Sequence, residues 1–181
     1  MAQTIIVADD HPLFRAALKQ AVSQAVPDAE TVEVDSIKAL QAAVESHPDA
    51  DLVLLDLNMP GAHGFSGLVF MRGQYPGLPV VVVSGSEELQ VMRRSIDYGA
   101  SGFIPKSAPL PTITEAIQAV LEGDVWLPPG VADKIEQMHS DATDFSEKLA
   151  SLTPQQFRVL GMLAEGLLNK QIAYDLDVSE A

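Results

Sequence analysis

Short apolar runs alternate with longer amphipathic segments over roughly the first two thirds of the chain. Five of the runs contain only four or five mainly apolar or β-branched residues, which is too few for a helix, and polar or turn-forming residues bound them. The runs at 52–55 and 80–83 are apolar throughout, as expected for strands buried on both faces of a sheet. The predicted strands lie at residues 4–8, 31–34, 52–55, 80–83 and 101–104.

Amphipathic helices are expected between these strands and after the last one. In each helix, apolar residues recur at spacings of three and four positions, which gives one face that can pack on a sheet. The expected helices start at Pro12, after the cap Ser36, near Phe65, near Leu89 and at Thr112. This alternation predicts an α/β fold, a five-stranded, doubly wound parallel sheet with the flavodoxin-like strand order 2-1-3-4-5 and helices on both faces.

A different pattern follows the fifth helix. Trp126 begins the exit from the first domain, and the acidic, polar stretch after it, with one short amphipathic helix, indicates a linker. Thr153, followed by a proline and then by Gln156, predicts a helix start, and Asn169 is expected to cap a second short helix. A turn into a third helix is expected from Asp177 onward. We therefore divide the chain into an α/β domain at 1–127, a linker at 128–150 and an all-α segment at 151–181.

The composition restricts the classes of protein to which this chain can belong. The 181 residues are 47% hydrophobic and 20% charged, which is ordinary for a globular protein with a sizeable core. No apolar run approaches the roughly 18 residues that a membrane span requires, and no secretion signal is visible, so no membrane partner is expected. Cysteine is absent, which excludes disulfides and thiolate chemistry. The formal charge of −14 repels phosphate backbones, so this stretch of chain is expected to bind nucleic acid poorly by itself.

Acidic residues stand at the carboxyl ends of two of the predicted strands. Asp9 and Asp10 follow the first strand, and Asp56 follows the third. In the expected strand order these two strands are neighbours at the switch point of the sheet, so the three carboxylates should converge there. Three carboxylates repel one another unless a cation joins them, and all-oxygen ligands suit Mg²⁺. The pattern therefore predicts a Mg²⁺ site at this edge.

Two further groups reach the same edge from the neighbouring strands. Ser84 ends the fourth strand, and Lys106 follows the fifth. This combination of groups suits the transfer of a phosphoryl group to one of the acids. The metal cation and the ammonium would neutralise the charge of the phosphoryl group, and the hydroxyl would donate a hydrogen bond to one of the phosphoryl oxygens.

Each of these residues also has a simpler interpretation. Asp56 can cap the loop or helix that follows it, and the acids before Pro12 can cap the first helix. Ser84 can be a turn residue, and Lys106 a solvated surface lysine. For His11 we favour a role in shaping the turn before Pro12 over a role as a metal ligand or base. Phe103, in the short fifth strand, is better explained as a core residue than as a switch on these grounds alone.

In combination, these residues resemble the receiver domain of two-component response regulators. The resemblance covers residues 1 to about 122 and rests on Asp9-Asp10, DLNMPG at 56–61, Ser84 and Lys106, in the order and strand positions of that family. It implies that the first residue of DLNMPG, Asp56, accepts a phosphoryl group from a phosphohistidine of a sensor histidine kinase.

The resemblance also implies metal ligands and switch residues. The implied Mg²⁺ ligands are Asp10, Asp56 and the backbone carbonyl of Asn58, with Asp9 acting directly or through water. Ser84 and Phe103 match the hydroxyl and aromatic switch positions of the family. One departure is that many receiver domains follow the lysine with proline, whereas here Pro105 precedes Lys106 and Ser107 follows it.

The opening DDHPLFR and residues 152–180 resemble the LuxR-type subfamily, whose output is a four-helix DNA-binding module of the helix-turn-helix type. Leu168 stands where a capping serine is common, and Asp177 stands where glycine is common in the turn. The recognition helix that would enter the major groove is absent beyond its first residues. We therefore expect the residues after about 150 to be loosely ordered unless they pack on the first domain or on a neighbouring molecule.

The expected function is a phosphorylation-controlled switch that, in its complete form, regulates transcription. The expected partners are a sensor histidine kinase and, only when the output domain is complete, DNA; a second copy of the chain is a further candidate. The resemblance implies a cytoplasmic location and no enzymatic turnover.

Two other classes of function stay open. One is a phosphatase with an aspartyl-phosphate intermediate, resembling the haloacid-dehalogenase hydrolases, which carry a second Asp two residues after the nucleophile. Here Asp9 is followed at that spacing by His11, and Asp10 by Pro12, which argues against this class. The other is an interaction module that works without phosphorylation. The complete set of acids disfavours it, and failure to accept phosphate would favour it.

Overall fold

The computed structural model describes residues 3–138, 151, 153, 155–156, 159, 162–163 and 166–176. Contacts within the chain divide it into two units, residues 1–135 and residues 136–181, and each unit is described by itself. No helix in the described ranges is long and apolar enough to cross a membrane.

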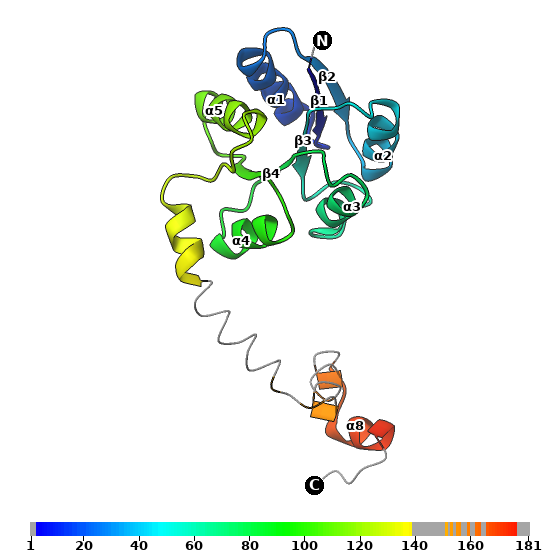
Figure 1. Ribbon diagram of the computed structural model, residues 1–181. Coiled ribbons are helices and arrows are strands. Elements are labelled where there is room, and N and C mark those ends of the chain that lie inside the picture. Colours follow the sequence, from blue (N-terminus) through cyan, green and yellow to red (C-terminus); the bar gives the residue numbers. More distant parts are fainter. Residues whose placement is uncertain are drawn as a thin grey trace. The chain divides into compact units, whose positions relative to one another are not determined.

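A five-stranded parallel sheet forms the centre of the first unit (Figure 1). The strands follow the order β2-β1-β3-β4-β5, which confirms the predicted topology. Their bounds are β1 (Thr4–Ala8), β2 (Glu30–Val34), β3 (Leu52–Asp56), β4 (Val80–Ser84) and β5 (Gly102–Pro105). β3 and β4 are buried at every position, as their continuous apolar runs predict. β2 forms one edge of the sheet, and its charged residues Glu30 and Glu33 disfavour pairing with a further strand.

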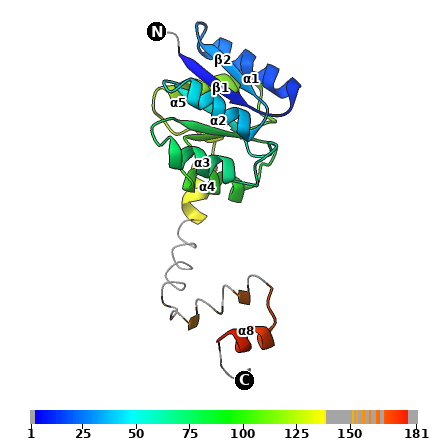
Figure 2. The same cartoon turned by 90° about the vertical axis from the view of Figure 1, so that its right-hand side faces the viewer.

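Helices cover both faces of this sheet (Figures 1 and 2). The helices are α1 (Pro12–Ala25), α2 (Ile37–Ser46), α3 (Ser66–Gln74), α4 (Leu89–Asp97) and α5 (Leu110–Leu121). α1 and α5 supply buried residues to the core on one face, and α2, α3 and α4 supply them to the core on the other. Ser36 caps α2 as predicted, because its hydroxyl accepts a hydrogen bond from Ala39 N at 3.3 Å.

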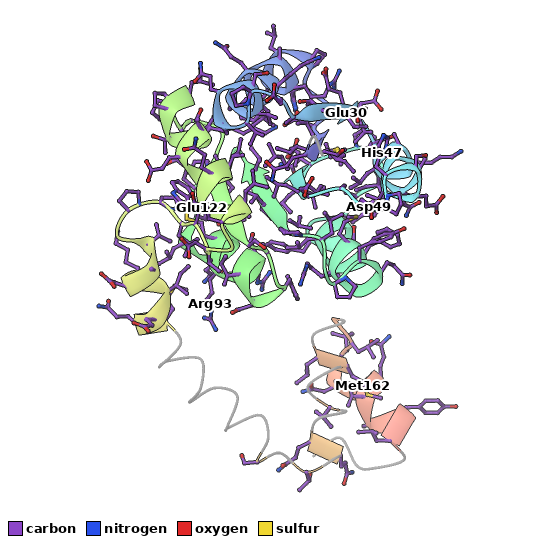
Figure 3. The ribbon with its side chains drawn as sticks, turned by 45° about the horizontal axis from the view of Figure 1, so that its top comes forward. Glu30, His47, Asp49, Arg93, Glu122 and Met162 are labelled. Carbon is purple, nitrogen blue, oxygen red and sulfur yellow. The ribbon has the colours of Figure 1, made fainter. Side chains whose placement is uncertain are left out.

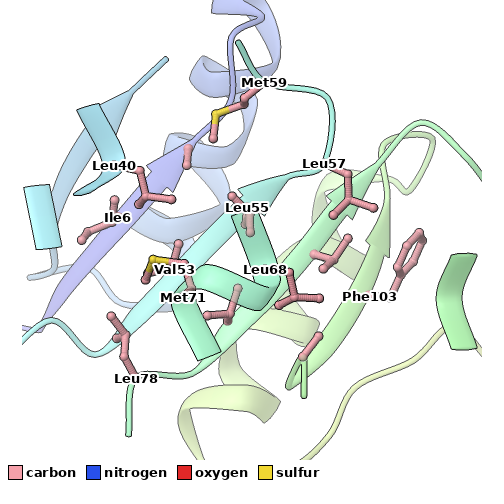
Figure 4. Packing of buried hydrophobic residues seen from close by; sticks show 14 of the residues in the cluster. Ile6, Leu40, Val53, Leu55, Leu57, Met59, Leu68, Met71, Leu78 and Phe103 are labelled. Carbon is pink, nitrogen blue, oxygen red and sulfur yellow. The ribbon is translucent and has the colours of Figure 1, made fainter. Parts of the chain in front are cut away.

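The two cores hold the carboxyl ends of the strands in fixed positions. Figure 4 shows part of the core on the face covered by α2, α3 and α4, where Leu40, Val53, Leu68 and Phe103 are fully buried. Each large apolar side chain removed from water in this way contributes about 1.5–3 kcal/mol to folding. The strand ends that carry the predicted site residues are therefore anchored by tightly packed side chains on both faces.

α5 begins at Leu110 rather than at the predicted Thr112. Pro111 lies in the first turn of the helix. A proline is tolerated there because the amide hydrogen it lacks would have no partner within the helix. The amides of Thr112 and Ile113 both donate to the carbonyl of Pro109, which closes this first turn.

The residues after α5 stay with the first unit. Trp126 forms a parallel bridge with Gly102, and residues 131–138 are helical, as predicted. Val131 and Ile135 are buried in the core on the α4 side. The first unit therefore extends to Ile135, beyond residue 127, which is the predicted end of the first domain.

Several acidic side chains lie at the surface of this unit. Glu30, Asp49 and Glu122, which are labelled in Figure 3, are exposed. Among the described residues, the buried charged side chains are Asp9 and Asp56.

The second unit is described in part. Thr153 and Gln156 form the predicted capping box: Thr153 N donates to Gln156 Oε1 at 2.9 Å, and Gln156 N donates to Thr153 Oγ1 at 3.2 Å. The prediction that Asn169 caps the next helix is wrong, because Asn169 is the first residue of α8 (Asn169–Leu176). Leu168 takes the position before the helix, where its carbonyl accepts hydrogen bonds from the amides of Gln171 and Ile172. The expected turn from Asp177 onward lies outside the described residues, as does much of the segment after 150 that we expect to be loosely ordered.

Candidate functional site

The buried acids Asp9 and Asp56 lie side by side at the carboxyl end of the sheet. β1 and β3 are neighbours with Ala8 opposite Leu55, so each acid follows directly after a paired residue. Asp9 is 0% exposed and Asp56 is 1% exposed. Burying a charged carboxylate is unfavourable unless a cation or hydrogen-bond donors accompany it. The groups around these two acids therefore determine what the site can do.

Lys106 supplies the cation. Its Nζ lies 2.7 Å from Asp9 Oδ2 and 2.9 Å from Asp56 Oδ2, and it sits 4.9 Å from the centroid of the Phe14 ring. Burial by itself lowers the pKa of Lys106, but the hydrogen bonds and charges of Asp9 and Asp56 outweigh it, so the pKa lies above its usual value. Lys106 is therefore positively charged at neutral pH and joins acids from two different strands.

Backbone amides hold each carboxylate in place. Asn58 N donates to Asp56 Oδ1 at 3.0 Å, and His11 N donates to Asp9 Oδ1 at 2.8 Å. In both cases the donor stands two residues after the acid, as in an Asx turn. Arg15 Nη1 also donates to the carbonyl of Asp9 at 2.6 Å. One oxygen of each acid is thus fixed by its own loop, and the other oxygen faces the ammonium.

Asp10 and His11 complete the cluster at its exposed side. His11 Nδ1 lies 2.8 Å from Asp10 Oδ1, 3.4 Å from Asp9 Oδ1 and 3.9 Å from Asp56 Oδ2. His11 also precedes α1, where its carbonyl accepts from Arg15 N, so it does shape the turn as expected. The sequence pattern did not predict that the imidazole would face the acids. The sequence did contain one signal for this contact, because His11 directly follows two acids at the end of a predicted strand.

The acids fit a hard divalent cation. One ligand atom from each of Asp9, Asp10, His11 and Asp56 lies within 4.8 Å of the others. Asp9 Oδ2 and Asp10 Oδ1 are both buried oxygens, with Lys106 Nζ 2.7 Å from the first and His11 Nδ1 2.8 Å from the second. Carboxylate oxygens in this arrangement suit Mg²⁺, which binds through one or two carboxylates plus water or phosphate oxygens.

A shallow cavity of about 510 Å³ opens above Asp56. His11, Leu13, Phe14, Asn58, Gly85 and Lys106 complete its lining. Asp9 and Asp10 are not part of this lining, so Asp56 is the acid that a molecule entering the cavity meets. The volume is sufficient for a phosphoryl group and part of the group that carries it.

Neither Ser84 nor Phe103 lines this cavity, although Gly85, the neighbour of Ser84, does. Ser84 is 1% exposed, and its Oγ accepts a hydrogen bond from Ser86 N at 3.1 Å. Phe103 is fully buried in the core on the α4 side, as the simpler interpretation of this residue predicts. The carbonyl of Ser84 accepts from Lys106 N at 2.8 Å, which ties the end of β4 to the end of β5.

The chain around Lys106 has contacts that the sequence did not indicate. No peptide bond among the described residues is cis, including those on either side of Lys106. Ser107, which stands in the position where proline is common, donates a hydrogen bond to Glu87 Oε1 on the loop after β4. The loops that follow β4 and β5 are therefore joined above the site by side chains as well as by the backbone.

Comparison with known proteins agrees with the two-part organisation of the chain. Residues 5–118 match the family described as response regulator receiver domains, and residues 150–181 match the bacterial regulatory proteins of the luxR family. The chain is 42% identical to the glycerol metabolism activator of Pseudomonas putida over 97% of this chain and 82% of that protein. It is 30% identical to the nitrate/nitrite response regulator protein NarL of Escherichia coli over 98% of this chain and 82% of that protein.

Solved structures show the same relationship. A LuxR family DNA-binding response regulator from Silicibacter pomeroyi is 31% identical to this chain, with a TM-score of 0.62 over 70% of this chain and 98% of that one. The RcsB response regulator of Salmonella typhimurium, at 24% identity, has a TM-score of 0.70 over 98% of this chain and 85% of that one, which shows that the fold is alike.

Proposed function

Since the chain belongs to the LuxR-type response regulators, which control transcription through phosphorylation, we propose that Asp56 is the residue that accepts its phosphoryl group. The observation that carries this proposal is the setting of the Asp56 carboxylate. It is buried at the end of β3, pairs with Lys106 at 2.9 Å, and forms part of the cavity wall. Asp9 shares the ammonium but does not line the cavity, so it serves as a neighbouring charge.

The proposed donor is a phosphohistidine on a sensor histidine kinase. A carboxylate oxygen of Asp56 attacks the phosphorus and forms an O–P bond while the N–P bond breaks. The electron pair of that bond passes to the imidazole nitrogen, which takes up a proton from solvent. Lys106 stays in place beside the acceptor and balances the charge on the phosphoryl oxygens. Asn58 N holds one oxygen of the carboxylate, which limits its rotation during the attack.

The proposed metal ligands are Asp10, Asp56 and the carbonyl of Asn58, with Asp9 acting directly or through water. Mg²⁺, when bound there, would neutralise charge on the phosphoryl oxygens. This assignment is supported by the grouping of the acids within 4.8 Å and by the buried oxygens of Asp9 and Asp10.

Ser84 and Phe103 are the proposed switch residues. The Ser84 hydroxyl accepts a hydrogen bond from Ser86 N within its own loop, and its own hydrogen stays available for donation to a phosphoryl oxygen on Asp56. If Ser84 rotates toward that oxygen, the change reaches β5, because β4 pairs with β5 and Val82 lies opposite Phe103. The phosphorylated and unphosphorylated states would then differ in the surface around α4 and β5.

The proposed role in transcription depends on a complete output domain. Structures of RcsB show two dimers bound to DNA, and by analogy we propose that this protein acts on DNA as a pair of copies. In that role Asp56 is modified once for each signal and does not turn over a substrate. The cytoplasm is the compartment in which a kinase phosphohistidine and DNA are both accessible to it.

Intact-mass spectrometry tests the proposed acceptor. The full 181-residue chain is incubated with acetyl phosphate, with and without Mg²⁺, beside Asp56→Asn and the matched control Asp51→Asn. Asp51 precedes the same strand at its other end, where Oδ2 accepts a hydrogen bond from Thr4 N that an asparagine oxygen can also accept. The expected result is one phosphate-sized mass gain in the wild-type protein and in Asp51→Asn, only with Mg²⁺, and none in Asp56→Asn.

Other outcomes of this experiment would reject Asp56 as the acceptor or favour one of the two other classes of function. An equal mass gain in Asp56→Asn would reject Asp56 as the acceptor. No gain in the wild-type protein, under conditions that modify a known receiver domain, would favour an interaction module that works without phosphorylation. Steady release of inorganic phosphate from many equivalents of a phosphate ester would favour the phosphatase.

A further inference from the structure

The segment after α5 closes the free edge of the sheet. β5 is the last strand in the sheet, so one side of its backbone has no neighbouring strand. Trp126 N donates to the carbonyl of Ser101 at 3.1 Å, and Phe103 N donates to the carbonyl of Trp126 at 3.1 Å. These two bonds form the parallel bridge between Trp126 and Gly102. The segment therefore satisfies backbone groups of β5 that would otherwise face water or another chain.

The same segment buries side chains on both faces of the sheet. Trp126, which is 9% exposed, packs in the core on the side of α1 and α5. Val131 and Ile135, 9% and 6% exposed, pack in the core on the opposite side, which also contains Met92 of α4. The helix that begins at residue 131, yellow in Figure 1, lies beside α4 in both views (Figures 1 and 2). The segment thus passes around β5 from one core to the other.

Phe103 joins this segment to β5, the strand that leads to Lys106. Its amide is bound to Trp126, and its fully buried ring belongs to the same core as Val131 and Ile135. Three residues later in the chain, Lys106 pairs with Asp56. A shift of Phe103 would therefore disturb both the backbone pairing and the side-chain packing of the segment.

At Gly102 the backbone of β5 lies very close to the backbone of Trp126. A Cβ atom at this position would lie 2.9 Å from the carbonyl oxygen of Trp126, which is a backbone atom and cannot rotate away. Any side chain at residue 102 would therefore push Trp126 off β5. Gly77 offers a matched comparison, because a Cβ there would have no atom within 4 Å.

We propose that residues 124–135 form a phosphorylation-sensitive contact of this protein. They are docked on β5 and on the core at the α4 side while Asp56 is unmodified, and they are released when phosphorylation moves Phe103. The inference rests on the proposed function, because it takes phosphorylation of Asp56 as the event that moves Phe103. Residues 124–135 lead directly into the second unit, so their release changes how that unit is tethered. Trp126 is a positioning residue in this arrangement and acts through the backbone of Phe103.

Hydrogen exchange and tryptophan fluorescence test this contact in the full chain. Trp126 is the one tryptophan of the sequence, so the emission spectrum reports its environment alone. After treatment with acetyl phosphate and Mg²⁺, with phosphate gain checked by intact mass, the amides of Phe103 and Trp126 should exchange about tenfold faster, whereas those of β1 keep their rate. The emission should move to longer wavelength as the indole becomes more exposed.

Gly102→Ala should place the unmodified protein in the released state. Its Phe103 and Trp126 amides should exchange about tenfold faster than in the wild-type protein without phosphate, and phosphorylation should add little further change. Coupling free energies are reciprocal, so a several-fold larger fraction of Gly102→Ala should carry phosphate once the level has become constant with acetyl phosphate. Gly77→Ala should resemble the wild-type protein in all three measurements.

A second pair of variants covers the case in which Gly102→Ala does not fold. Ile135→Ala removes packing on the α4 side and should show the same changes, whereas Lys134→Ala, at an exposed position of the same helix, should not. Wild-type protein that carries phosphate on Asp56 but keeps its exchange rates and emission spectrum would overturn the inference and leave the proposed function intact. A wild-type protein that takes up no phosphate would overturn both.

Discussion

Lys106 is the residue on which the two buried acids depend. It contacts Asp9 and Asp56 across a sequence separation of 50 residues or more, and the structure describes no other side-chain cation at this distance from both. Removing one partner of a buried ion pair leaves an uncompensated charge, which is more costly than losing the pair as a whole.

Lys106→Met should therefore lower the free energy of unfolding at neutral pH, without added metal, by roughly 3 kcal/mol. Urea denaturation followed by circular dichroism measures the change. Lys134→Met, at an exposed position, serves as the control and should change little. A loss below about 0.5 kcal/mol, the usual range for surface substitutions, would show that the acids do not depend on this ammonium.

The same ion pairs predict a pH dependence. The pKa of Lys106 is raised above its usual 10.5, so its stabilising effect is complete below about pH 10.5 and is lost as the pH rises through the higher pKa of the folded state. The difference in unfolding free energy between the wild-type protein and Lys106→Met should stay constant from neutral pH to about pH 10 and shrink above it. Urea denaturation of both proteins over this range measures the difference, and a difference that shrinks already near pH 8 would contradict the assignment.

Asp10 illustrates a conflict between stability and chemistry. It places a third carboxylate beside two buried ones, and without a metal these charges repel one another. Asp10→Asn should therefore raise the free energy of unfolding in metal-free buffer by about 1 kcal/mol, while it weakens phosphate uptake that depends on Mg²⁺. Chemical denaturation and intact mass measure the two effects, and Asp49→Asn, an exposed acid away from the site, should change neither.

Among the elements, the sequence predicted best those whose signals are local. The apolar runs predict β1, β3 and β4, and the Ser36 cap predicts the start of α2. The predicted start of α5 at Thr112 was two residues late, because the helix already begins at Leu110 and has a proline in its first turn. The pairing of Trp126 with β5 could not be predicted, because it depends on which strand lies at the edge of the sheet.

Ser36→Ala tests the cap of α2. The side chain satisfies the amide of Ala39, so its loss should destabilise the first unit by about 1 kcal/mol, measured by thermal or urea denaturation. Ser46→Ala, at the other end of the same helix, is the matched control. The Ser46 hydroxyl donates to the carbonyl of Ala42, a contact that does not stabilise a helix, so this change should be neutral or slightly favourable. Equal losses in the two variants would argue against the cap.

For the molecule as a whole, the acid cluster couples folding to divalent metal. A ligand that binds only the folded state stabilises it, by about 2.7 kcal/mol at 100 times its dissociation constant. The melting temperature of the wild-type protein should therefore rise with Mg²⁺, more than it does with NaCl at equal ionic strength. Asp10→Asn should lose most of this Mg²⁺-specific rise, and an unchanged rise in that variant would place the metal elsewhere.

The amino-acid sequence was enough to predict the order of strands and helices, the positions of Asp9, Asp56, Ser84 and Lys106 at strand ends, and the membership of the chain in its family. These features depend on short-range periodicity and on motif order, which are present in the chain before it folds. Together with the handedness of parallel connections, they were sufficient to predict the sheet order.

The folded structure was needed to show which groups come into contact. It places the ammonium of Lys106 between two acids and turns the imidazole of His11 toward them. It also opens the cavity onto Asp56 rather than Asp9 and docks Trp126 on β5. The sequence does not indicate that these residues are neighbours or how their side chains are oriented. The physical reason is that such contacts depend on packing and side-chain direction in three dimensions, where a difference of a few ångströms separates an ion pair from a solvated charge.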